Sequence, residues 1–432
     1  MNTIIKELSE KLDTSAPTLS TLDSYWDGTQ PAAYLSKDAR DALGTTLTGL
    51  AVNFPKLAVT SLAERLEVRG FREAGSSEAT DTGLWRTWRR CHMLDASAQA
   101  HMDALVYGRS FIIVWADENG PLVTVESPKQ VAVKHDPATR KVTAAFKRWA
   151  TDGQAHGVLY EQDKITRLVS SSNVVDGAGF PSTGWQTVEV IANPFGVVPV
   201  VPLVNRGRLL DLDGVSEMTD ILGLTDALNK LLSDSLVSSE FYARPRRWAT
   251  GLELQEDEDG NVIQPFSNEA NKVWISENEG TKFGQFDGAR LDGYSDLIAT
   301  VTNQIGALSG LPPHYIGINS AQPPSADAIR SAEASLVAKA NSLQRTFGQA
   351  WANVAALIKS AETGEDPLGY DFEPVWASEE TRTTAQATDA AVKLHSIGVP
   401  LPAILSETLG WTPEQVSLVS TPAVPATPAI NN

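Results

Sequence analysis

The sequence predicts an α+β fold, because helical and strand patterns occupy separate stretches of the chain. In long runs such as residues 216–242, apolar residues recur every three or four positions, as in a helix with one buried face. Between residues 111 and 191 the pattern changes to short strands separated by Gly, Asn, Asp and Pro turns, which is typical of an antiparallel meander. A chain of 432 residues is long enough for roughly two or three packing units.

The N-terminal half is expected to begin with helices and to continue with strands. Residues 1–72 are predicted to be helical, with the last of these helices ending at Gly70, because glycine often follows a helix end. A further helix is expected from Trp85 to Tyr107. A proline-bounded stretch at 193–202 is expected to end the strand block. The strands themselves are predicted at residues 111–115, 122–125, 131–133, 142–149, 156–161, 164–169 and 187–191.

The later part of the chain predicts two long helical rods joined by a small β tip. The first rod runs from Ser216 to Tyr242 and leads into a turn-rich β insertion at 244–288. The second rod spans Leu291–Leu308, and a loop with two prolines at each end follows, from Pro312 to Pro324. A third long helix begins at the N-cap Ser325 and runs to Ala361. Such rods do not build a compact core by themselves, so we predict that they pack against further copies in a ring.

The charge balance argues against a protein that binds nucleic acid tightly through its phosphates. The formal net charge is −18 and the isoelectric point is about 4.8, whereas proteins that bind phosphates need an excess of Lys and Arg. Acidity is consistent with solubility alone, or with a surface that lies beside DNA without binding it. No apolar run approaches the roughly 20 residues that span a bilayer. The N-terminus has no apolar signal core, so we expect the product to be intracellular where it is made.

The sequence contains no recognisable catalytic or metal-binding motif. It lacks the G-x-x-x-x-G-K-[ST] phosphate loop, the H-E-x-x-H zinc motif and the G-x-S-x-G nucleophile elbow. Its six histidines are scattered without metal-ligand spacing. The single cysteine, Cys91, excludes an internal disulfide framework and any zinc site with several cysteines. We therefore expect neither an enzyme, nor a cofactor, nor a metal site.

Several short sequence stretches, taken in order along the chain, resemble those of a known family. The resembling stretches are Leu22–Gly28, Asn53–Pro55 through Arg65–Leu66, Tyr107–Ser110, Ser309–Gly317 and Gln322–Arg330. Together with the order of helix, β tip and helix, they resemble the portal proteins of long-tailed, double-stranded DNA bacteriophages, in the branch common among actinobacterial phages. The resemblance covers about residues 20–415. Each stretch alone is a weak signal, and their order is what makes the resemblance specific.

The resemblance implies a portal-type ring subunit of about twelve copies at one vertex of the phage head, a conduit for packaging and ejecting double-stranded DNA. It implies an α/β wing, a two-helix stem, a small β-rich clip, a long kinked helix and a short helical crown. The implied regions are the wing (1–213), the stem (214–243 and 289–311), the clip (244–288), the tunnel loop (312–324), the long helix returning to the wing (325–377) and the crown (378–415). Residues 416–432 are expected to be a disordered Pro/Ala tail.

The partners implied by the resemblance are those of a head–tail junction. They are other copies of this chain, double-stranded DNA that passes through the channel without sequence-specific recognition, the large terminase subunit, the head–tail adaptor, and the major capsid and scaffolding proteins; no membrane is involved. The expected location is the portal vertex of the virion, with assembly in the host cytoplasm. Two alternatives stay open: another head–tail connector or structural virion protein, and a carboxylate-dependent hydrolase.

Two groups of residues are candidates for function. The loop 312–324 contains no Lys or Arg, and the resemblance implies that it faces DNA; its alternative interpretation is a stiff connector between helices. Its candidate DNA-facing residues are His314, Tyr315, Asn319, Ser320 and Gln322. The second group lies in the β tip. Its arginines are expected to be exposed cations at a helix end, to dock acidic partners, or to pair with the acidic turn of a neighbouring copy. Its members are Arg244, Arg246, Arg247, Glu256, Asp257, Glu258 and Asp259.

Overall fold

The structure is a computed structural model that divides into two compact units. It describes residues 2–31, 51–75, 81–118, 120–173, 180–181, 184–205, 207–242, 247–251, 280–285, 292–317, 325–380 and 384–420. Unit 1 holds residues 1–30, 53–222 and 306–432, and unit 2 holds residues 31–52 and 223–305. Unit 2 is therefore built from two segments that interrupt the sequence of unit 1. Within the described ranges, no helix combines the length and the apolar character that a membrane span requires.

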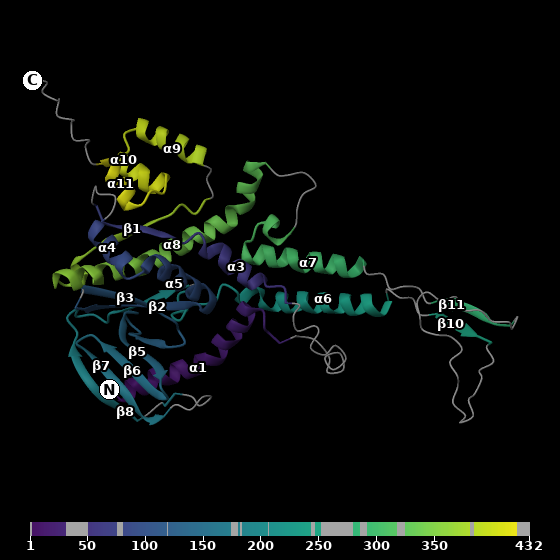
Figure 1. Ribbon diagram of the computed structural model, residues 1–432, viewed down its shortest axis with the longest axis horizontal. Coiled ribbons are helices and arrows are strands. Elements are labelled where there is room, and N and C mark those ends of the chain that lie inside the picture. Colours follow the sequence, from purple (N-terminus) through teal and green to yellow (C-terminus); the bar gives the residue numbers. More distant parts are fainter. Residues whose placement is uncertain are drawn as a thin grey trace, which may run out of the picture. The chain divides into compact units, whose positions relative to one another are not determined.

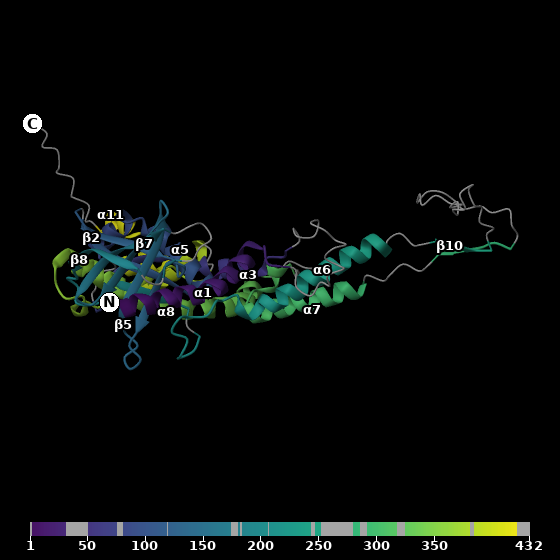
Figure 2. The ribbon, with the colours of Figure 1, turned by 90° about the horizontal axis from the view of Figure 1, so that it is seen from below.

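A five-stranded antiparallel sheet carries the first helix on one face. The strands are β4 (Val131–His135), β5 (Val142–Thr151), β6 (Gln154–Glu161), β7 (Lys164–Asn173) and β8 (Trp185–Ala192). Their order in the sheet equals their order in the sequence, which confirms the predicted meander. Helix α1 (Asn2–Asp27) lies alongside these strands, in purple in Figures 1 and 2. Its Ile5 and Leu8 pack against Phe146 of β5, so one face of the meander is buried.

A second, three-stranded sheet contains the first two predicted strands, so these two are not part of the five-stranded meander. Its order is β3 (Gly120–Glu126), β2 (Arg109–Asp117) and β9 (Val200–Val204), and both pairings are antiparallel. The proline-bounded stretch, expected to end the strand region, contributes to its last strand, β9, and pairs Pro202 with Phe111 of β2. Proline is tolerated there because β9 is an edge strand, where a missing backbone N–H need not leave a neighbour unpaired.

The predicted helix end at Gly70 is wrong. Helix α3 (Phe54–Ala63) starts at the N-cap Asn53 and ends before that residue. Gly70 lies in β1 (Val68–Glu73), which pairs antiparallel with β12 (Phe372–Trp376), and the register shifts between Val68 and Gly70. A strand partner about 300 residues away in sequence therefore overrides the local helix signal.

One predicted helix is two helices. Helix α4 (Thr82–Arg90) is capped by the Asp81 carboxylate, which accepts from the Gly83 and Leu84 backbone amides. Helix α5 (Met93–Tyr107) begins after His92, whose φ of 56° is left-handed and cannot continue a helix. Apolar spacing continues across this break, so periodicity alone did not reveal it.

Helix α8 (Ala326–Thr363) forms the centre of the main core of unit 1. Its predicted N-cap is confirmed, because the Ser325 hydroxyl accepts from the Ala328 backbone amide. Trp351 of α8 packs edge to face against Trp88 of α4 at 5.1 Å between ring centroids. Phe71 of β1 also packs edge to face against Trp88, at 5.0 Å between ring centroids. In Figure 1, α8 (green) crosses α4, α5 and β1, the elements that contribute these rings.

Unit 2 contains the two predicted rods. Helices α6 (Leu222–Tyr242) and α7 (Asp292–Ser309) lie side by side in Figures 1 and 2, and the hydroxyls of Ser238 and Tyr294 are 3.3 Å apart. The first rod begins six residues later than predicted. Beyond it, β10 (Arg247–Thr250) and β11 (Lys282–Gln285) form an antiparallel pair.

A small helical cluster follows the core of unit 1. It contains α9 (Thr384–Ser396), α10 (Leu401–Ala403), a π-helical turn (Ile404–Thr408) and α11 (Pro413–Ser420). Arg72 of β1 binds this cluster through Glu407, at 2.6 Å between the guanidinium and the carboxylate. Burial of Ile404, Leu405 and Val416 gives the cluster an apolar centre of its own. The disordered tail expected at 416–432 is wrong for residues 416–420, which belong to α11 and include the buried Val416. Residues 421–432 lie outside the described residues, so their expected disorder stays a prediction.

Candidate functional site

The first predicted site is described only in part. Of the candidate loop residues, the structure describes His314 and Tyr315, which lie in the 3₁₀ turn η3 (Pro313–Ile316). Asn319, Ser320 and Gln322 lie outside the described residues. The two residues at the start of the loop therefore lie together in one turn. The other three members of the predicted DNA-facing set stay a prediction.

The turn η3 is attached to the body of unit 1 through a buried carboxylate. Glu333 of α8 lies 3.7 Å from the His314 imidazole and 3.4 Å from the Arg65 guanidinium. Both Arg65 and Glu333 are buried. Tyr315 is half-buried and packs against the main core. These contacts are what hold the turn in place, and a DNA-facing role for His314 and Tyr315 stays a proposal.

The second predicted site lies almost entirely outside the described residues. Only Arg247 among its members is described, as the first residue of β10 opposite Gln285. The other members, Arg244, Arg246, Glu256, Asp257, Glu258 and Asp259, lie in stretches that are not described. Partner docking at this tip therefore stays a prediction.

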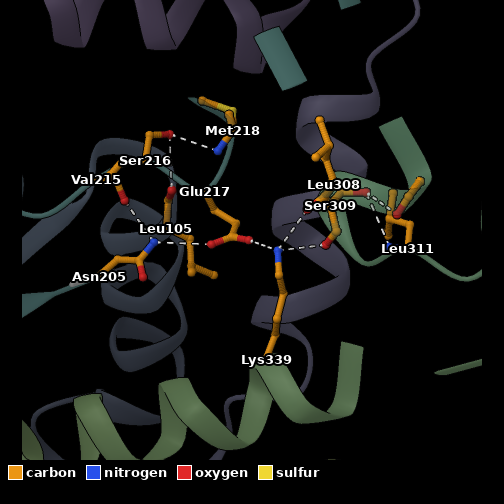
Figure 3. Close-up of polar contacts among 11 residues, drawn as sticks. Leu105, Asn205, Val215, Ser216, Glu217, Met218, Leu308, Ser309, Leu311 and Lys339 are labelled. Carbon is orange, nitrogen blue, oxygen red and sulfur yellow. Dashed lines mark hydrogen bonds and ion pairs between the residues drawn. The ribbon is translucent and has the colours of Figure 1, made fainter. Parts of the chain in front are cut away.

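A polar junction that the sequence did not reveal lies where the chain leaves and re-enters unit 1. Figure 3 shows Lys339 of α8 reaching toward Glu217 on one side and toward the last residues of α7 on the other. The Lys339 ammonium lies 2.5 Å from the Glu217 carboxylate. It also donates to the backbone carbonyls of Ser309, at 3.0 Å, and Leu308, at 3.5 Å. One side chain thus contacts segments about 90 residues apart in sequence.

The segment that leads into α6 is fixed on the last turns of α5. The Glu217 backbone amide donates to the Leu105 carbonyl at 2.9 Å, and the Asn205 side-chain amide donates to the Val215 carbonyl at the same distance. The Ser216 hydroxyl accepts from the Met218 amide at 3.2 Å. Because Ser216 binds this amide and a 3₁₀ turn follows at Thr219–Ile221, the regular helix begins at Leu222 rather than at Ser216.

Two glycines allow the backbone to cross itself beside this junction. Gly108 ends α5 with a φ of +88°, and Gly214 has a φ of +73°. A Cβ atom on Gly214 would lie 1.9 Å from the Gly108 carbonyl oxygen, which no side chain permits. A Cβ atom on Gly108 would lie 2.8 Å from the Gly214 carbonyl carbon. Both positions therefore require glycine for space as well as for conformation.

Helix α7 presents a surface without positive charge. Its sequence, DGYSDLIATVTNQIGALS, contains two aspartates and no Lys or Arg. Asp292, Asp296, Ala299, Asn303 and Ala307 recur at helical spacing and are all exposed. In α6, Lys230 is paired with Asp234 at 2.6 Å. Such a face can lie beside a polyanion without binding it, because it offers no cation to displace counterions. Among the described residues, no group of three or more His, Cys, Asp or Glu side chains could hold a metal ion.

Comparison with known proteins gives the family. The chain matches the family described as "Phage portal protein, SPP1 Gp6-like" over residues 5–412, and it therefore belongs to this family of phage portal proteins. The portal protein of Mycobacterium phage L5 is 30% identical over 417 residues, which cover 91% of this chain and 82% of the relative. That of Mycobacterium phage D29 is 31% identical over 366 residues, covering 80% and 73%. These matches confirm the resemblance, including its actinobacterial branch.

Solved structures from gene transfer agent particles are also similar. A chain from the virion of a native particle has a TM-score of 0.49 and 15% identity, with 85% of this chain and 92% of that chain covered. A chain from the neck of an empty particle has a TM-score of 0.48 and 12% identity, with 87% and 93% covered.

Proposed function

We propose that copies of this chain form the ring through which double-stranded DNA enters and leaves a phage head. The observation that carries the proposal is the family match across residues 5–412. The uncharged and acidic surface of α7 supports it, because a conduit must enclose DNA without holding it. The net charge of −18 also supports it, because a negatively charged protein repels the DNA backbone. In this proposal the chain acts mechanically and electrostatically rather than as an enzyme.

Each region of the chain has the role that the portal resemblance implies. Residues 1–213 form the wing, 214–243 and 289–311 the stem that lines the channel, and 244–288 the clip. The loop 312–324 faces DNA, and the helices of 378–415 form the crown. The clip docks the large terminase subunit during packaging and the head–tail adaptor afterwards, while the wing meets capsid and scaffolding proteins. The assembly occupies the portal vertex of the virion and is built in the host cytoplasm.

The ring is tested by measuring the mass of the isolated assembly. Twelve copies of the 46.4 kDa chain give about 560 kDa, and negative-stain images should show a particle with a central opening. A chain that stays solitary and fully folded at every concentration, and in the presence of capsid and scaffolding proteins, would contradict the proposal.

The DNA-facing loop is tested by shortening it. Removing residues 318–323 should leave ring assembly intact and reduce the number of DNA-filled heads, because the ring then lacks its contact with the moving duplex. Ring assembly is checked by mass, and packaging by nuclease-protected DNA. Normal packaging by the shortened chain would refute the assignment of the loop while leaving the ring itself unaffected.

A further inference from the structure

The C-terminal end of α7 lacks a basic residue of its own. The last carbonyl groups of a helix have no partner within the helix, and they carry the negative end of its dipole. Lys or Arg in the last turn is a common remedy, but α7 contains neither. The Gly310 amide donates to the Gly306 carbonyl at 2.9 Å, which satisfies one of these groups.

Lys339 supplies the missing cation from another helix. Its ammonium group has three N–H donors and three recorded acceptors, namely the carbonyls of Leu308 and Ser309 and the carboxylate of Glu217. Figure 3 shows the three acceptors converging on the Lys339 nitrogen. The side chain is 36% exposed and that of Glu217 is 17% exposed, so the group is only partly screened by water.

Gly310 lies beside Lys339 just after the end of α7. It follows α7 with a φ of +77°, and a Cβ atom there would lie 3.5 Å from the Lys339 Cδ and 3.1 Å from the Ser335 hydroxyl. The turn after α7 is thus packed directly against α8. The Lys339 cap is therefore part of a close contact between the C-terminal end of α7 and the side of α8.

We propose that Lys339 is a positioning residue that fixes the end of α7 relative to the segment leading into α6. It caps the last carbonyls of one rod and holds Glu217, five residues before the first residue of the other. Movement of either segment must break a charge-assisted hydrogen bond or carry the other with it. In the ring this residue keeps the two stem helices in register, a role that rests on the proposed function.

Hydrogen exchange, measured by mass spectrometry on the purified full chain, tests the proposal. Lys339→Met removes the charge and keeps the apolar stem of the side chain. We expect exchange at least about tenfold faster in peptides from both 306–311 and 214–222. Lys359→Met is the matched control, because Lys359 lies on the same helix, is 28% exposed and pairs with Asp81 at 3.3 Å. It should leave both segments unchanged. Protection of both segments in Lys339→Met would overturn the proposal.

A charge swap separates capping from simple ion pairing. The double variant Glu217→Lys with Lys339→Glu restores an ion pair but places an acceptor next to the Leu308 and Ser309 carbonyls. Exchange in 306–311 should therefore stay fast in the swap and return toward normal in Lys339→Arg, which keeps the charge and the donors. Restored protection of 306–311 in the swap would show that the pair alone matters and would overturn the capping role. If Lys339→Met does not fold, Glu217→Gln tests the same link, with faster exchange expected in 214–222.

Packaging tests the role in the ring separately. Heads assembled with Lys339→Met should contain rings of normal mass and at least about threefold less protected DNA than heads with Lys359→Met. Equal packaging by the two variants would overturn the role in the stem, whatever the exchange result. If the unaltered chain forms no ring at all, the proposed function fails, while the exchange measurements still decide whether Lys339 caps α7.

Discussion

At the scale of single residues, the crossing of Gly108 and Gly214 is the tightest constraint described for the chain. Gly214→Ala would place a methyl group 1.9 Å from a backbone oxygen in addition to imposing an unfavourable φ. We expect it to lower the free energy of unfolding by about 3 kcal/mol or more. The measurement is urea denaturation of the purified chain, followed by tryptophan fluorescence.

Gly364→Ala is the matched control for this crossing. Gly364 has a similar φ of +78°, but among the described residues no atom beyond its chain neighbours lies within 4 Å of where its Cβ would be. It should therefore cost only the conformational term, about 1–2 kcal/mol. Equal effects of the two substitutions would show that the crossing relaxes and that space does not limit this site.

The buried His101 makes stability depend on pH. It lies in the main core and accepts a hydrogen bond from the Trp351 indole at 2.8 Å. Complete burial lowers its pKa from 6.5 to about 3. As the pH falls below about 6.5, His101 therefore binds a proton in the unfolded chain but stays neutral in the folded chain. This contribution to stability is present above pH 6.5 and is lost as the pH falls toward 3.

His101→Gln should remove this dependence. The glutamine oxygen can still accept from Trp351, and the amide does not titrate. Between pH 6.5 and pH 5, the unaltered chain should lose up to about 1.4 kcal/mol per pH unit more than the variant. Urea denaturation at both pH values measures the difference. His395→Gln, on the exposed side of α9, should behave like the unaltered chain. Parallel pH profiles for all three proteins would contradict the account of His101.

At the scale of elements, the absence of positive charge from α7 is the feature with the clearest consequence. Ala299→Lys combined with Asn303→Lys adds two cations to its exposed acidic face. The assembled ring should then bind duplex DNA more tightly, by about tenfold or more at low salt, and with a steeper dependence on salt. Filter binding at several salt concentrations measures this.

A lysine elsewhere on the surface distinguishes a specific effect from net charge. Gln349→Lys places a cation on an exposed position of α8. Together with Thr346→Lys, also exposed on α8, it matches the change in net charge of the α7 variant. Identical DNA binding by the two double variants would show that the exposed face of α7 does not line the channel.

Element types could largely be predicted from the sequence, and pairings between distant elements could not. Helix α8 was found with its N-cap Ser325, because capping is a local signal. The meander was found because each strand pairs with the next one along the chain. The partner of β1 lies about 300 residues away, and no local pattern specifies it. The left-handed His92, which divides α4 from α5, also lacks a local signal.

The candidate site was predictable only where it is contiguous in sequence. The loop and tip residues were predicted from composition and from the portal resemblance, and their roles stay predictions. Lys339 was missed, because its three acceptors belong to segments that meet only in the folded chain. The one usable signal was negative: a predicted helix, 291–308, without any basic residue in its last turn, which requires a cap from elsewhere.

At the scale of the whole molecule, unit 1 depends on a strand near the end of the chain. Phe372 and Val375 of β12 are buried, and β12 covers β1. A chain truncated after Asp371 should therefore lose cooperative unfolding or melt at least about 10 °C lower than a chain truncated after Glu380. Differential scanning calorimetry measures this. Equal melting temperatures would show that the core closes without β12.

The division of unit 1 into three stretches of sequence also affects its synthesis. A ribosome must reach Phe372 before β1 can pair, and Trp88 has no Trp351 to pack against until α8 has emerged. The roughly 300 residues between the two strands take on the order of 15 to 60 seconds to synthesise at typical elongation rates. Throughout that time the aromatic side chains of the nascent polypeptide lack their partners in the core, which leaves a long interval in which chaperones can bind it.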